Sequence, residues 1–565
     1  MTNTTTTNTN QQIDLWTPIL APLNSPTCQG SFALLVLVLI LSAIMQHRHP
    51  QLSDGRFATR AEVKKGYKQG LRQIAQQIPN EAALNFGRLV LPDLQPAVAV
   101  VGRSRAGKTR SIFDPGIKSA IDQEWTCLIQ DVKGNLMQKH AAYAHSKGYD
   151  VYVLAPGFDY SDSFNPLTLM RDSSDAKNAQ EISTVLNVNF QEPGTKQDPF
   201  FGPQGISLLK TTFMLAKHSP FPDLLTAWKI LSLDNLAARL TAAKKYGLFE
   251  YDGELDSWIG EAAVALRSVT HAEETSSGIV GSAVTYFQSL IDSSILPCLL
   301  RHTIPLDLPG KQIVFFQLDE QNEAATSPLV ATAIHMLVKR NLNASVKRDR
   351  TLGLWLDEFT AARFPDIEAW ISRFAEYGMV CVLGYQSNAQ IRLRYSRDHA
   401  ESILSSCGTK IVFNTGHPET AENFSTALGY KDVWYQSQSR SYGKNNQTSR
   451  SDSVQKVPLI SGPAINRMRQ GECIILSPGL DYRPLKLRVP LKRRDTTLWK
   501  RCSRVWQKEI CPTLIEQTEQ RMEGVSIDVE LSDREVIAQT MLPTAEELEA
   551  LKNVRELRTR SGSVS

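Results

Sequence analysis

Residues Ala97 to Thr109 read AVAVVGRSRAGKT, an apolar run followed directly by a glycine-rich loop. The loop fits the pattern GxxxxGK[ST], in which glycines let backbone N–H groups approach phosphates, the lysine reaches the β- and γ-phosphates, and the hydroxyl holds Mg²⁺. A segment able to form a helix follows, which would place the phosphates at a helix N-terminus, where the helix dipole favours anions. The sequence therefore predicts a site for ATP and Mg²⁺, with Thr109 also a metal ligand, whose nucleotide-binding residues are Gly102, Arg103, Ser104, Arg105, Ala106, Gly107, Lys108 and Thr109.

The segments around this loop predict an α/β fold. Short apolar runs alternate with longer helical patterns, which is typical of a mostly parallel sheet covered by helices, and several runs are apolar throughout, as strands buried on both faces are. The expected strands are Ala97 to Val101, Thr126 to Gln130, Asp150 to Leu154, Gln312 to Gln317, Gly353 to Leu356, Val380 to Gly384, Lys410 to Asn414 and Glu472 to Leu476. Between about Asp172 and Ile304 only helical spacing is found, so we expect an all-α insertion that interrupts one nucleotide domain.

Two further motifs supply polar groups at strand ends. The run LGLWLDE ends in Asp357 and Glu358, of which the first would hold Mg²⁺ through water and the second would polarise the attacking water. Gln386 follows the apolar run MVCVLGY at the carboxyl edge of the sheet, where it could sense the γ-phosphate. Taken alone, an acid pair after a strand also fits a solvated turn, and an isolated Gln386 is better interpreted as a turn residue facing solvent.

The N-terminal part predicts one membrane span. Cys28 to Gln46 contains nineteen uncharged residues, CQGSFALLVLVLILSAIMQ, enough for a helix of about 28 Å. The alternative is a buried core helix. The basic residues all follow the span, so the positive-inside rule places the bulk of the chain in the cytoplasm. These residues are Arg48, Arg56, Arg60, Lys64, Lys65, Lys68 and Arg72.

Charge and cysteine usage set limits on other functions. The net charge of +4 is too small to indicate a nucleic-acid binder by itself. The eight cysteines form no CxxC pair, which disfavours a zinc module and a disulfide framework. The polar run Gln436 to Gln455 is interpreted as a solvated loop, and the basic run Arg483 to Lys508 is followed by an acidic C-terminal region.

Taken together, the motifs resemble the type IV secretion coupling proteins of the TraD/TraG type, hexameric motors that feed conjugative DNA and its relaxase to a secretion channel. The resemblance covers most of residues 90 to 480. DVKG is its most specific piece, because it is not part of the general P-loop signature, and in the family it helps to shape the nucleotide site, here through Asp131. The other matching pieces are GRSRAGKT with Arg105 where the family often has arginine, SFNPL at Ser163 to Leu167, DPFFGPQGISLL, LDEF at Leu356 to Phe359, GYQSNAQI at Gly384 to Ile391, and GECIILSPG.

The resemblance implies a RecA-like P-loop NTPase core with an inserted all-α domain, an N-terminal transmembrane helix in the bacterial inner membrane, and a homo-hexamer around a central DNA path. Carried over by position, Lys108 and Thr109 bind the nucleotide and Mg²⁺, and Asp357 with Glu358 supports hydrolysis. Gln386 becomes the sensor. The implied partners are single-stranded DNA with bound relaxase, type IV secretion channel components and inner-membrane lipid.

This sequence departs from the family pattern in two places. Only one span is readable, where many relatives have two. The family's trans-acting arginine usually occupies the position of Ala375, so Arg373, two residues earlier, is a candidate catalytic residue, with a helix-surface arginine as the alternative.

The expected organisation runs from one side of the membrane to a charged C-terminal region. Its parts are an extracytoplasmic segment 1–27, a single-pass transmembrane helix 28–46, a basic juxtamembrane linker 47–89, a RecA-like domain formed by 90–171 and 305–490, an all-α insertion 172–304, and a basic then acidic C-terminal tail 491–565.

Three functions compete. The favoured one is an ATP-driven translocase for relaxase-bound single-stranded DNA; the second is a nucleotide-switched receptor for protein substrates; the third, a chromosome pump of the FtsK type, is disfavoured by DVKG, the helical insertion and the short anchor. Phosphate contacts could come from the loop with Arg440, Lys444 and Arg450, although a solvated linker is the better interpretation there. They could also come from the basic run Arg483 to Lys508 with Trp499 and Trp506, for which lipid headgroups are an equal alternative.

Overall fold

The computed structural model divides into two compact units, one of Met1–Gly55 with Gly429–Leu459 and one of Arg56–Leu428 with Ile460–Ser565. The structure describes residues 37–38, 53, 55–87, 89–191, 194, 201–250, 252–268, 273–441, 447–489 and 493–562. The predicted span Cys28 to Gln46 lies outside these residues except for Leu37 and Val38. In the part of the chain that is described, no helix combines the length and the apolar character needed to cross a membrane.

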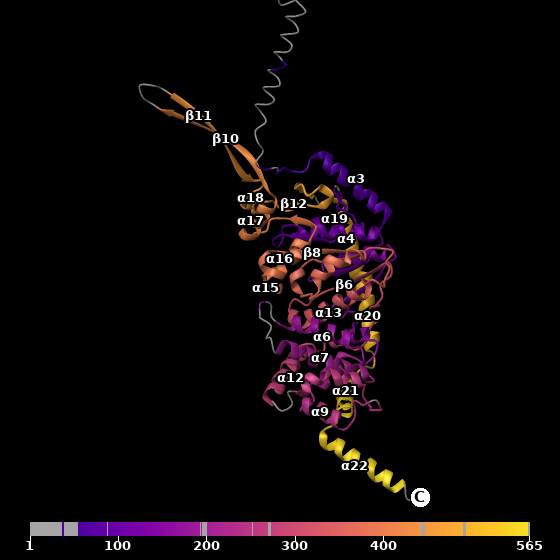
Figure 1. Ribbon diagram of the computed structural model, residues 1–565. Helices are drawn as coiled ribbons and strands as arrows, with labels where there is room; N and C mark the ends of the chain where they lie inside the picture. The colour runs from indigo at the N-terminus through magenta and orange to yellow at the C-terminus, as the bar shows by residue number, and fades with distance from the viewer. Residues whose placement is uncertain are drawn as a thin grey trace, which may run out of the picture. The chain divides into compact units, whose positions relative to one another are not determined.

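The larger unit contains a nine-stranded sheet in the order β13-β12-β9-β3-β8-β7-β4-β6-β5 (Figure 1). The run from β9 to β5 is parallel, and β12 and β13 add antiparallel pairs at one edge. All eight predicted strands are present, which confirms the α/β prediction. The sheet also contains β13 (Leu485–Arg488), which was not predicted. The eight predicted strands are β3 (Ala97–Val101), β4 (Thr126–Gln130), β5 (Asp150–Leu154), β6 (Gln312–Phe316), β7 (Leu352–Leu356), β8 (Met379–Tyr385), β9 (Thr409–Val412) and β12 (Glu472–Leu476).

Apolar side chains leave the sheet on both faces. In β3, Ala97, Ala99 and Val101 enter one hydrophobic cluster while Val98 and Val100 enter the other, as the two-residue period of a strand requires. Helices cover both faces, which is why β3, β4, β7 and β8 are buried at every position. One face is covered by α4 (Asp114–Asp122) and α5 (Met137–His145), and the other by α13 (Glu323–Asn341), α16 (Arg397–Ser406) and α17 (Pro418–Ala427).

Shorter elements complete the core. They are α3 (Arg60–Gln76), β1 (Leu84–Asn85), β2 (Val90–Leu91), the π-helical turns η2 (Thr109–Phe113) and η6 (Trp370–Phe374), the 3-10 turns η3 (Pro166–Leu169), η5 (Phe359–Ala361) and η7 (Pro478–Leu480), and helices α14 (Ile367–Ala369), α15 (Asn388–Tyr395) and α18 (Gly462–Asn466).

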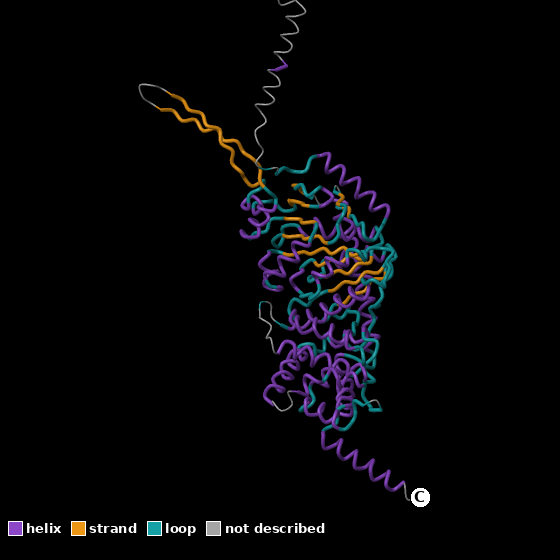
Figure 2. Tube along the Cα trace, in the orientation of Figure 1, coloured by secondary structure: helices purple, strands orange, loops and turns teal. Residues whose placement is uncertain are grey.

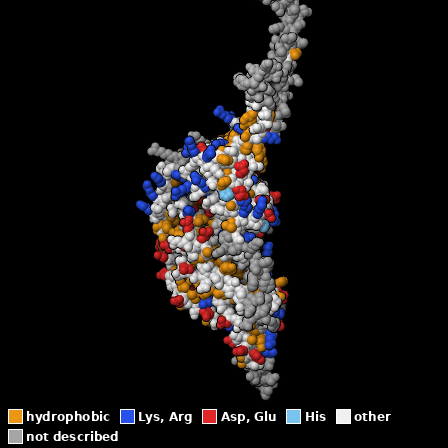
Figure 3. Space-filling model, turned by 90° about the vertical axis from the view of Figure 1, so that its left-hand side faces the viewer, with side chains coloured by type: hydrophobic (Ala, Val, Ile, Leu, Met, Phe, Trp, Pro, Cys, Tyr) orange, Lys and Arg blue, Asp and Glu red, His pale blue; other side chains and the backbone are white. Residues whose placement is uncertain are grey.

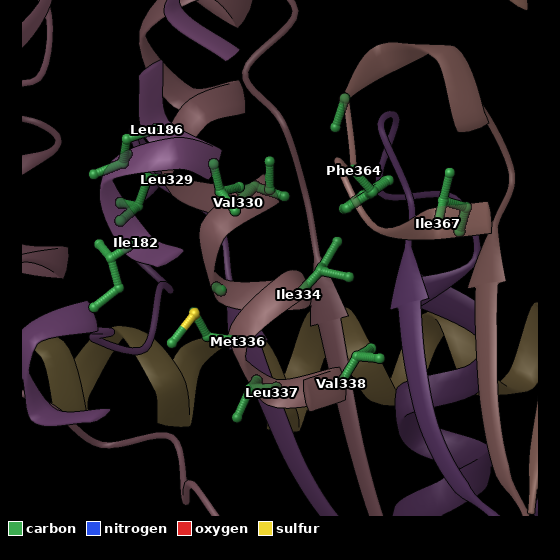
Figure 4. Packing of buried hydrophobic residues seen from close by; sticks show 14 of the residues in the cluster. Ile182, Leu186, Leu329, Val330, Ile334, Met336, Leu337, Val338, Phe364 and Ile367 are labelled. Atoms are coloured by element: carbon green, nitrogen blue, oxygen red, sulfur yellow. The ribbon is translucent and has the colours of Figure 1, made fainter. Parts of the chain in front are cut away.

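A purely helical part adjoins the core within the same unit, where Figure 2 shows no strand. Its helices are α6 (Ala176–Phe190), α7 (Phe201–His218), α8 (Leu224–Leu231), α9 (Leu236–Lys245), α10 (Ser257–Ala262), α11 (Val264–Ser268) and α12 (Glu273–Gln288), with the 3-10 turn η4 (Leu296–Cys298). Helix α13 joins the two parts: Figure 4 shows Leu186 of α6 beside Leu329 of α13, with Ile334 turned toward Phe364 of the core. One continuous hydrophobic cluster therefore runs from the sheet into the helical part.

The C-terminal region, predicted to be a basic then acidic tail, forms helices that pack on both parts. These are α19 (Arg493–Val505), the π-helical turn η8 (Trp506–Ile510), α20 (Cys511–Met522), α21 (Ile527–Met541) and α22 (Ala545–Gly562). Against the core, the Trp499 ring meets His140 at 4.5 Å between centroids. Against the helical part, Arg534 lies 2.6 Å from Asp223, and both side chains are buried. The region is therefore a strap that connects the core to the helical part.

The smaller unit contains a two-stranded antiparallel hairpin of β10 (Tyr430–Ser441) and β11 (Gln447–Pro458). The interpretation of Gln436 to Gln455 as a solvated loop is therefore wrong, apart from residues 442–446, which lie outside the described chain. Polar composition misled here because both faces of this ribbon carry exposed polar side chains where they are described, and ladder hydrogen bonds do not depend on side-chain polarity.

Candidate active site

Four neighbouring strands bring the predicted polar residues to one edge of the sheet. The order β3-β8-β7-β4 is parallel throughout, so the carboxyl ends of these strands lie side by side. Gly102 follows β3, Gln386 follows β8, Asp357 follows β7 and Asp131 follows β4. Ligands of open α/β sheets bind at this edge.

The loop between β3 and η2 is shaped by its two glycines. A Cβ on Gly102 would lie 2.7 Å from Cβ of Phe413, so only glycine fits there. Gly107 has a φ of +114°, which L side chains rarely adopt, and Arg105 also has a positive φ of 62°. The loop is held from outside by three backbone hydrogen bonds, from Gly102 N to Tyr385 O at 3.1 Å, from Arg103 N to Asn414 O at 2.8 Å and from Gly471 N to Ala106 O at 2.9 Å.

Lys108 and Thr109 make the contacts that a phosphate and metal site needs. Nζ of the buried Lys108 donates to the carbonyl of Gly102 at 2.6 Å, so the ammonium lies over the loop. Burial lowers the pKa of Lys108, while the nearby Glu358 and Asp357 oppose this shift. Oγ1 of Thr109 donates to the two carboxylate oxygens of Asp357 at 3.2 and 3.1 Å. A hydroxyl and a carboxylate in contact are the hard oxygen donors that Mg²⁺ prefers.

The surroundings of the carboxylates at this edge raise their pKa values. Burial raises the pKa of Asp357 to about 6, although Lys108 and the Thr109 hydroxyl lower it. Burial also raises the pKa of Asp131 to about 7, and the negative charge of Asp357 acts in the same direction. Two acids that are hard to ionise beside one another gain from a divalent cation, so the residues present fit Mg²⁺.

Glu358 and Gln386 face each other. Nε2 of Gln386 donates to both carboxylate oxygens of Glu358 at 3.3 Å. Both side chains are half-buried, so they are positioned yet reachable. A carboxylate oriented by an amide at the edge of a phosphate loop can position and deprotonate a water molecule.

Asp131 has a structural contact of its own. Its Oδ2 accepts a hydrogen bond from Met137 N at 2.8 Å, so the carboxylate caps the first turn of α5. Its charge is close enough to that of Asp357 for each to influence the other. The predicted role in shaping the nucleotide site agrees with this position without requiring direct contact.

The remaining predicted residues lie outside this cluster. Arg103, Ser104 and Arg105 are exposed. Arg373 is exposed on η6, before the amino end of β8, whereas Gln386 follows the carboxyl end of the same seven-residue strand. That separation is about 20 Å at the usual rise per strand residue, so Arg373 does not reach the residues at this edge of its own chain.

Sequence reasoning missed a buried cluster behind the loop. Asp114 is 2% exposed and lies 3.0 Å from Nζ of Lys139 and 3.2 Å from Nε2 of the fully buried His140. The carboxylate thus ties α4, which continues from the loop, to α5, which follows Asp131. The only signal in the sequence was an acid inside an apolar helical pattern. Asn414, whose Nδ2 donates to Asn466 O at 2.8 Å, was also missed, because it was assigned to the strand before it.

Comparison with known proteins adds a family to this geometry. The family model described as Type IV secretory system Conjugative DNA transfer matches residues 56–508. The chain is 22% identical over 310 residues to the coupling protein TraD of Escherichia coli (strain K12), covering 53% of this chain and 41% of TraD. It is 25% identical over 388 residues to the conjugal transfer protein TraG of Rhizobium radiobacter, covering 66% of this chain and 58% of TraG. The chain thus spans about half the length of the curated relatives it matches.

Solved structures of the plasmid coupling protein TrwB share the fold. The complex of TrwB with the non-hydrolysable ATP analogue ADPNP has a TM-score of 0.57 at 15% identity, covering 78% of this chain and 95% of TrwB. The complex with ADP and Mg²⁺ has a TM-score of 0.53 at 17% identity, covering 79% and 96%. Because the family model extends from α3 through the whole sheet to η8, the chain belongs to the family of type IV secretory system coupling proteins for conjugative DNA transfer.

Proposed function

We propose that this chain is an ATP-driven coupling protein that recruits relaxase-bound single-stranded DNA and moves it to a type IV secretion channel during conjugation. The observation that carries the proposal is the meeting of Lys108, Thr109, Asp357, Glu358 and Gln386 at one edge of a parallel sheet. Membership of a conjugative DNA-transfer family supplies the class of cargo.

Each of these residues has its own role in ATP hydrolysis. Lys108 neutralises the β- and γ-phosphates, and the backbone N–H groups of the loop orient them. Thr109 and, through water, Asp357 would hold Mg²⁺, which would supply positive charge to offset the negative charge that develops on the phosphates. Glu358 takes the proton of the attacking water, and Gln386 keeps the carboxylate aimed at it. We also propose that the core is RecA-like.

The basic surface of the larger unit supports a polyanionic substrate. In the predicted run, Trp499 and Trp506 are 7% and 4% exposed, so neither is available as a stacking platform for bases. Among the residues of this run whose side chains are described, the exposed cations are Lys486, Arg488, Lys500, Arg501, Arg504 and Lys508. Figure 3 shows Lys and Arg side chains gathered over the part of this unit that holds the sheet, while Asp and Glu are more frequent over the helical part. Contacts to phosphate without base stacking suit translocation of any sequence.

The membrane and assembly parts of the proposal rest on the sequence. We propose a single-pass anchor at residues 28–46 in the bacterial inner membrane, with the bulk of the chain in the cytoplasm. Helix α3, which follows in the chain, exposes Lys64, Lys65, Lys68 and Arg72, which suit anionic lipid headgroups. The proposed assembly is a homo-hexamer, in which the exposed Arg373 would be offered to a neighbouring subunit.

Conjugative transfer from donor cells tests the proposal. Cells whose only copy of the chain carries Lys108→Ala should transfer no DNA, because the γ-phosphate loses its positive partner. Cells with Lys347→Ala, at an exposed lysine in the loop before β7, should transfer normally. Undiminished transfer with Lys108→Ala would exclude an ATP-driven motor. A purified chain whose ATP hydrolysis ignores DNA while it still binds a relaxase would favour the nucleotide-switched receptor.

A further inference from the structure

Two arginines lie together beside the loops that carry Glu358 and Gln386. Arg363 follows η5 in the segment after β7, and Arg394 lies in α15 after β8, so neighbouring parallel strands bring them to the same edge. Both side chains are half-buried. The pKa of Arg394 is lowered, chiefly by burial, and the positive charge of Arg363 acts in the same direction.

Neither arginine has an acidic partner among the described residues. Nη2 of Arg394 donates to Ala361 O at 2.7 Å, while its buried Nε has no hydrogen-bond partner. Glu323 is the acid that acts on Arg394, but it is exposed and forms no ion pair with it in the described structure.

Nearby arginines on α15 and α16 are paired. Arg392, two positions earlier, lies 2.8 Å from Glu419, and Arg397 lies 3.3 Å from Glu401. Arg392 and Arg397 therefore have carboxylate partners, whereas Arg363 and Arg394, whose neighbours Phe364 and Tyr395 are hydrogen-bonded, form no ion pair in the described structure. Holding like charges together out of full solvent costs free energy that a bound anion would offset.

The backbone around the pair is firmly held. Asn189 bonds the backbone of Arg363 on both sides, accepting from its N–H at 2.7 Å and donating to its carbonyl at 2.8 Å. Phe364 N donates to the hydroxyl of Tyr395 at 3.0 Å, and the Tyr395 ring stacks on Phe359 at 5.1 Å between centroids. Residues 359–364 and helix α15 are thus held together as one rigid body, which we call the clamp.

The clamp is joined to the hydrolytic residues through short paths. Ala361, which accepts from Arg394, donates its N–H to Glu358 O at 3.0 Å. Helix α15 begins immediately after Gln386 and is capped by Ser387. A change in the position of Glu358 or Gln386 between nucleotide states would therefore move the Arg394 guanidinium and the segment that carries Arg363.

We infer that Arg363 and Arg394 together bind a backbone phosphate of single-stranded DNA, so that the grip on DNA changes with the nucleotide state of the same subunit. This inference rests on the proposed function. Paired guanidinium groups suit phosphate, which they bind through several N–H donors at once, and they read no base, as a sequence-tolerant translocase requires. Lys108 is the cation that binds the phosphates of the subunit's own nucleotide. Arg363 and Arg394 are therefore available to bind a phosphate of the DNA.

The test is binding of a fluorescent oligo(dT) to the purified full-length chain across a salt series. Arg394→Gln and Arg363→Gln should each weaken binding at low salt and reduce the slope of log K against log[salt] by about 0.7, the value for one phosphate contact on a single strand. Arg394→Lys should keep most of the slope. Arg397→Gln, the matched control whose arginine already has Glu401, should bind as the parent does.

Each outcome separates the inference from the proposed function. If the parent binds oligo(dT) and both glutamine variants keep its affinity and slope, the inference is wrong while the proposed function stands. If the variants bind DNA normally but lose ATP-dependent association between subunits, the pair serves a neighbour's nucleotide, and the inference is again wrong. A parent chain that binds no DNA would overturn both. Thermal unfolding of each variant, together with the Arg394→Lys result, separates lost contacts from lost folding.

Discussion

Oγ1 of Thr109 donates to the carboxylate of Asp357 at 3.1 and 3.2 Å, although the two residues are 248 positions apart in the chain. The contact joins the start of η2 to the end of β7, so it requires both the phosphate loop and the parallel sheet to be correctly formed. It also places two oxygen donors suited to Mg²⁺ side by side.

The first prediction concerns this pair. Thr109→Val keeps the shape of the side chain but removes the hydroxyl, so the Mg²⁺ concentration needed for tight nucleotide binding should rise about 10- to 100-fold, the effect of losing a hydrogen bond to a charged group. Titration of Mg²⁺ against a fluorescent ATP analogue measures this change. Thr109→Ser, which keeps the hydroxyl, should stay near the parent, and an equal defect in both variants would exclude the role given to Oγ1.

Glu358 is predicted to act in the chemical step rather than in binding. Glu358→Gln removes the base but keeps the hydrogen-bonding shape next to Gln386, so single-turnover hydrolysis should slow by about 10²- to 10⁴-fold. The Kd for ATP should change little, because Lys108 and the loop remain. The control is Glu376→Gln, at an exposed glutamate that lies before the amino end of β8, at the opposite edge from Glu358. Unchanged turnover in Glu358→Gln would remove this residue from the mechanism.

Asp131 gives a pH dependence with a defined sign. Its folded-state pKa is raised to about 7 from an ordinary value of 3.8, so between these values the folded chain binds a proton that the unfolded chain does not. Without divalent cation, the contribution of Asp131 to stability is therefore favourable below about pH 4, declines as the pH rises, and levels off above about pH 7.

Asp131→Asn isolates this contribution, because an amide oxygen can still accept from Met137 N. The difference in free energy of unfolding between the variant and the parent, measured in EDTA by denaturant titration, should shift in favour of the variant as the pH rises from 4 to 7. The shift should reach at most about 4 kcal/mol, since each pKa unit is worth about 1.4 kcal/mol. A difference that stays flat across this range would show that Asp131 is ionised throughout.

The strap should control the stability of the helical part. Arg534 is 2% exposed, pairs with Asp223 at 2.6 Å, and lies over the Phe221 ring at 4.7 Å from its centroid. Arg534→Ala leaves Asp223 buried and unpaired, which costs about 3 to 5 kcal/mol. Hydrogen exchange should accelerate in α8 and α21 while β3 and β7 remain protected.

A surface pair between the same two helices provides the matched control. Lys229 lies 2.7 Å from Glu535, whose side chain is 52% exposed, so Glu535→Gln should cost less than about 1 kcal/mol. Equal effects of the two substitutions would mean that the buried pair does not fasten the strap.

The sheet could be read from the sequence because its strands are short apolar runs buried on both faces, a pattern that few other structures produce. β13 (LKLR) was missed because it is short, and alternating charges describe a half-exposed edge strand as well as they describe a loop. The β10–β11 hairpin was missed for a related reason, since its strands are held by each other's backbone.

Some residues of the candidate site could also be predicted from the sequence, and others could not. Lys108, Asp357 and Gln386 were predictable because each follows a recognisable strand, and parallel strands share one carboxyl edge. The buried link from Asp114 to His140 and the unpaired Arg394 were not predictable, because they depend on which helices pack together. The burial of Trp499 and Trp506 reversed their expected role, since a tryptophan in a basic run fits both a nucleic-acid surface and a helix packed on a core.

The most direct test of the central claim is the rate of ATP hydrolysis by the purified full-length chain, with and without single-stranded DNA, across a salt series. The account predicts that DNA accelerates hydrolysis, that added salt reduces the acceleration because phosphate contacts are screened, and that Lys108→Ala abolishes both basal and stimulated hydrolysis. Hydrolysis at one rate with and without DNA at every salt concentration, in a chain that still binds a relaxase, would contradict a DNA motor.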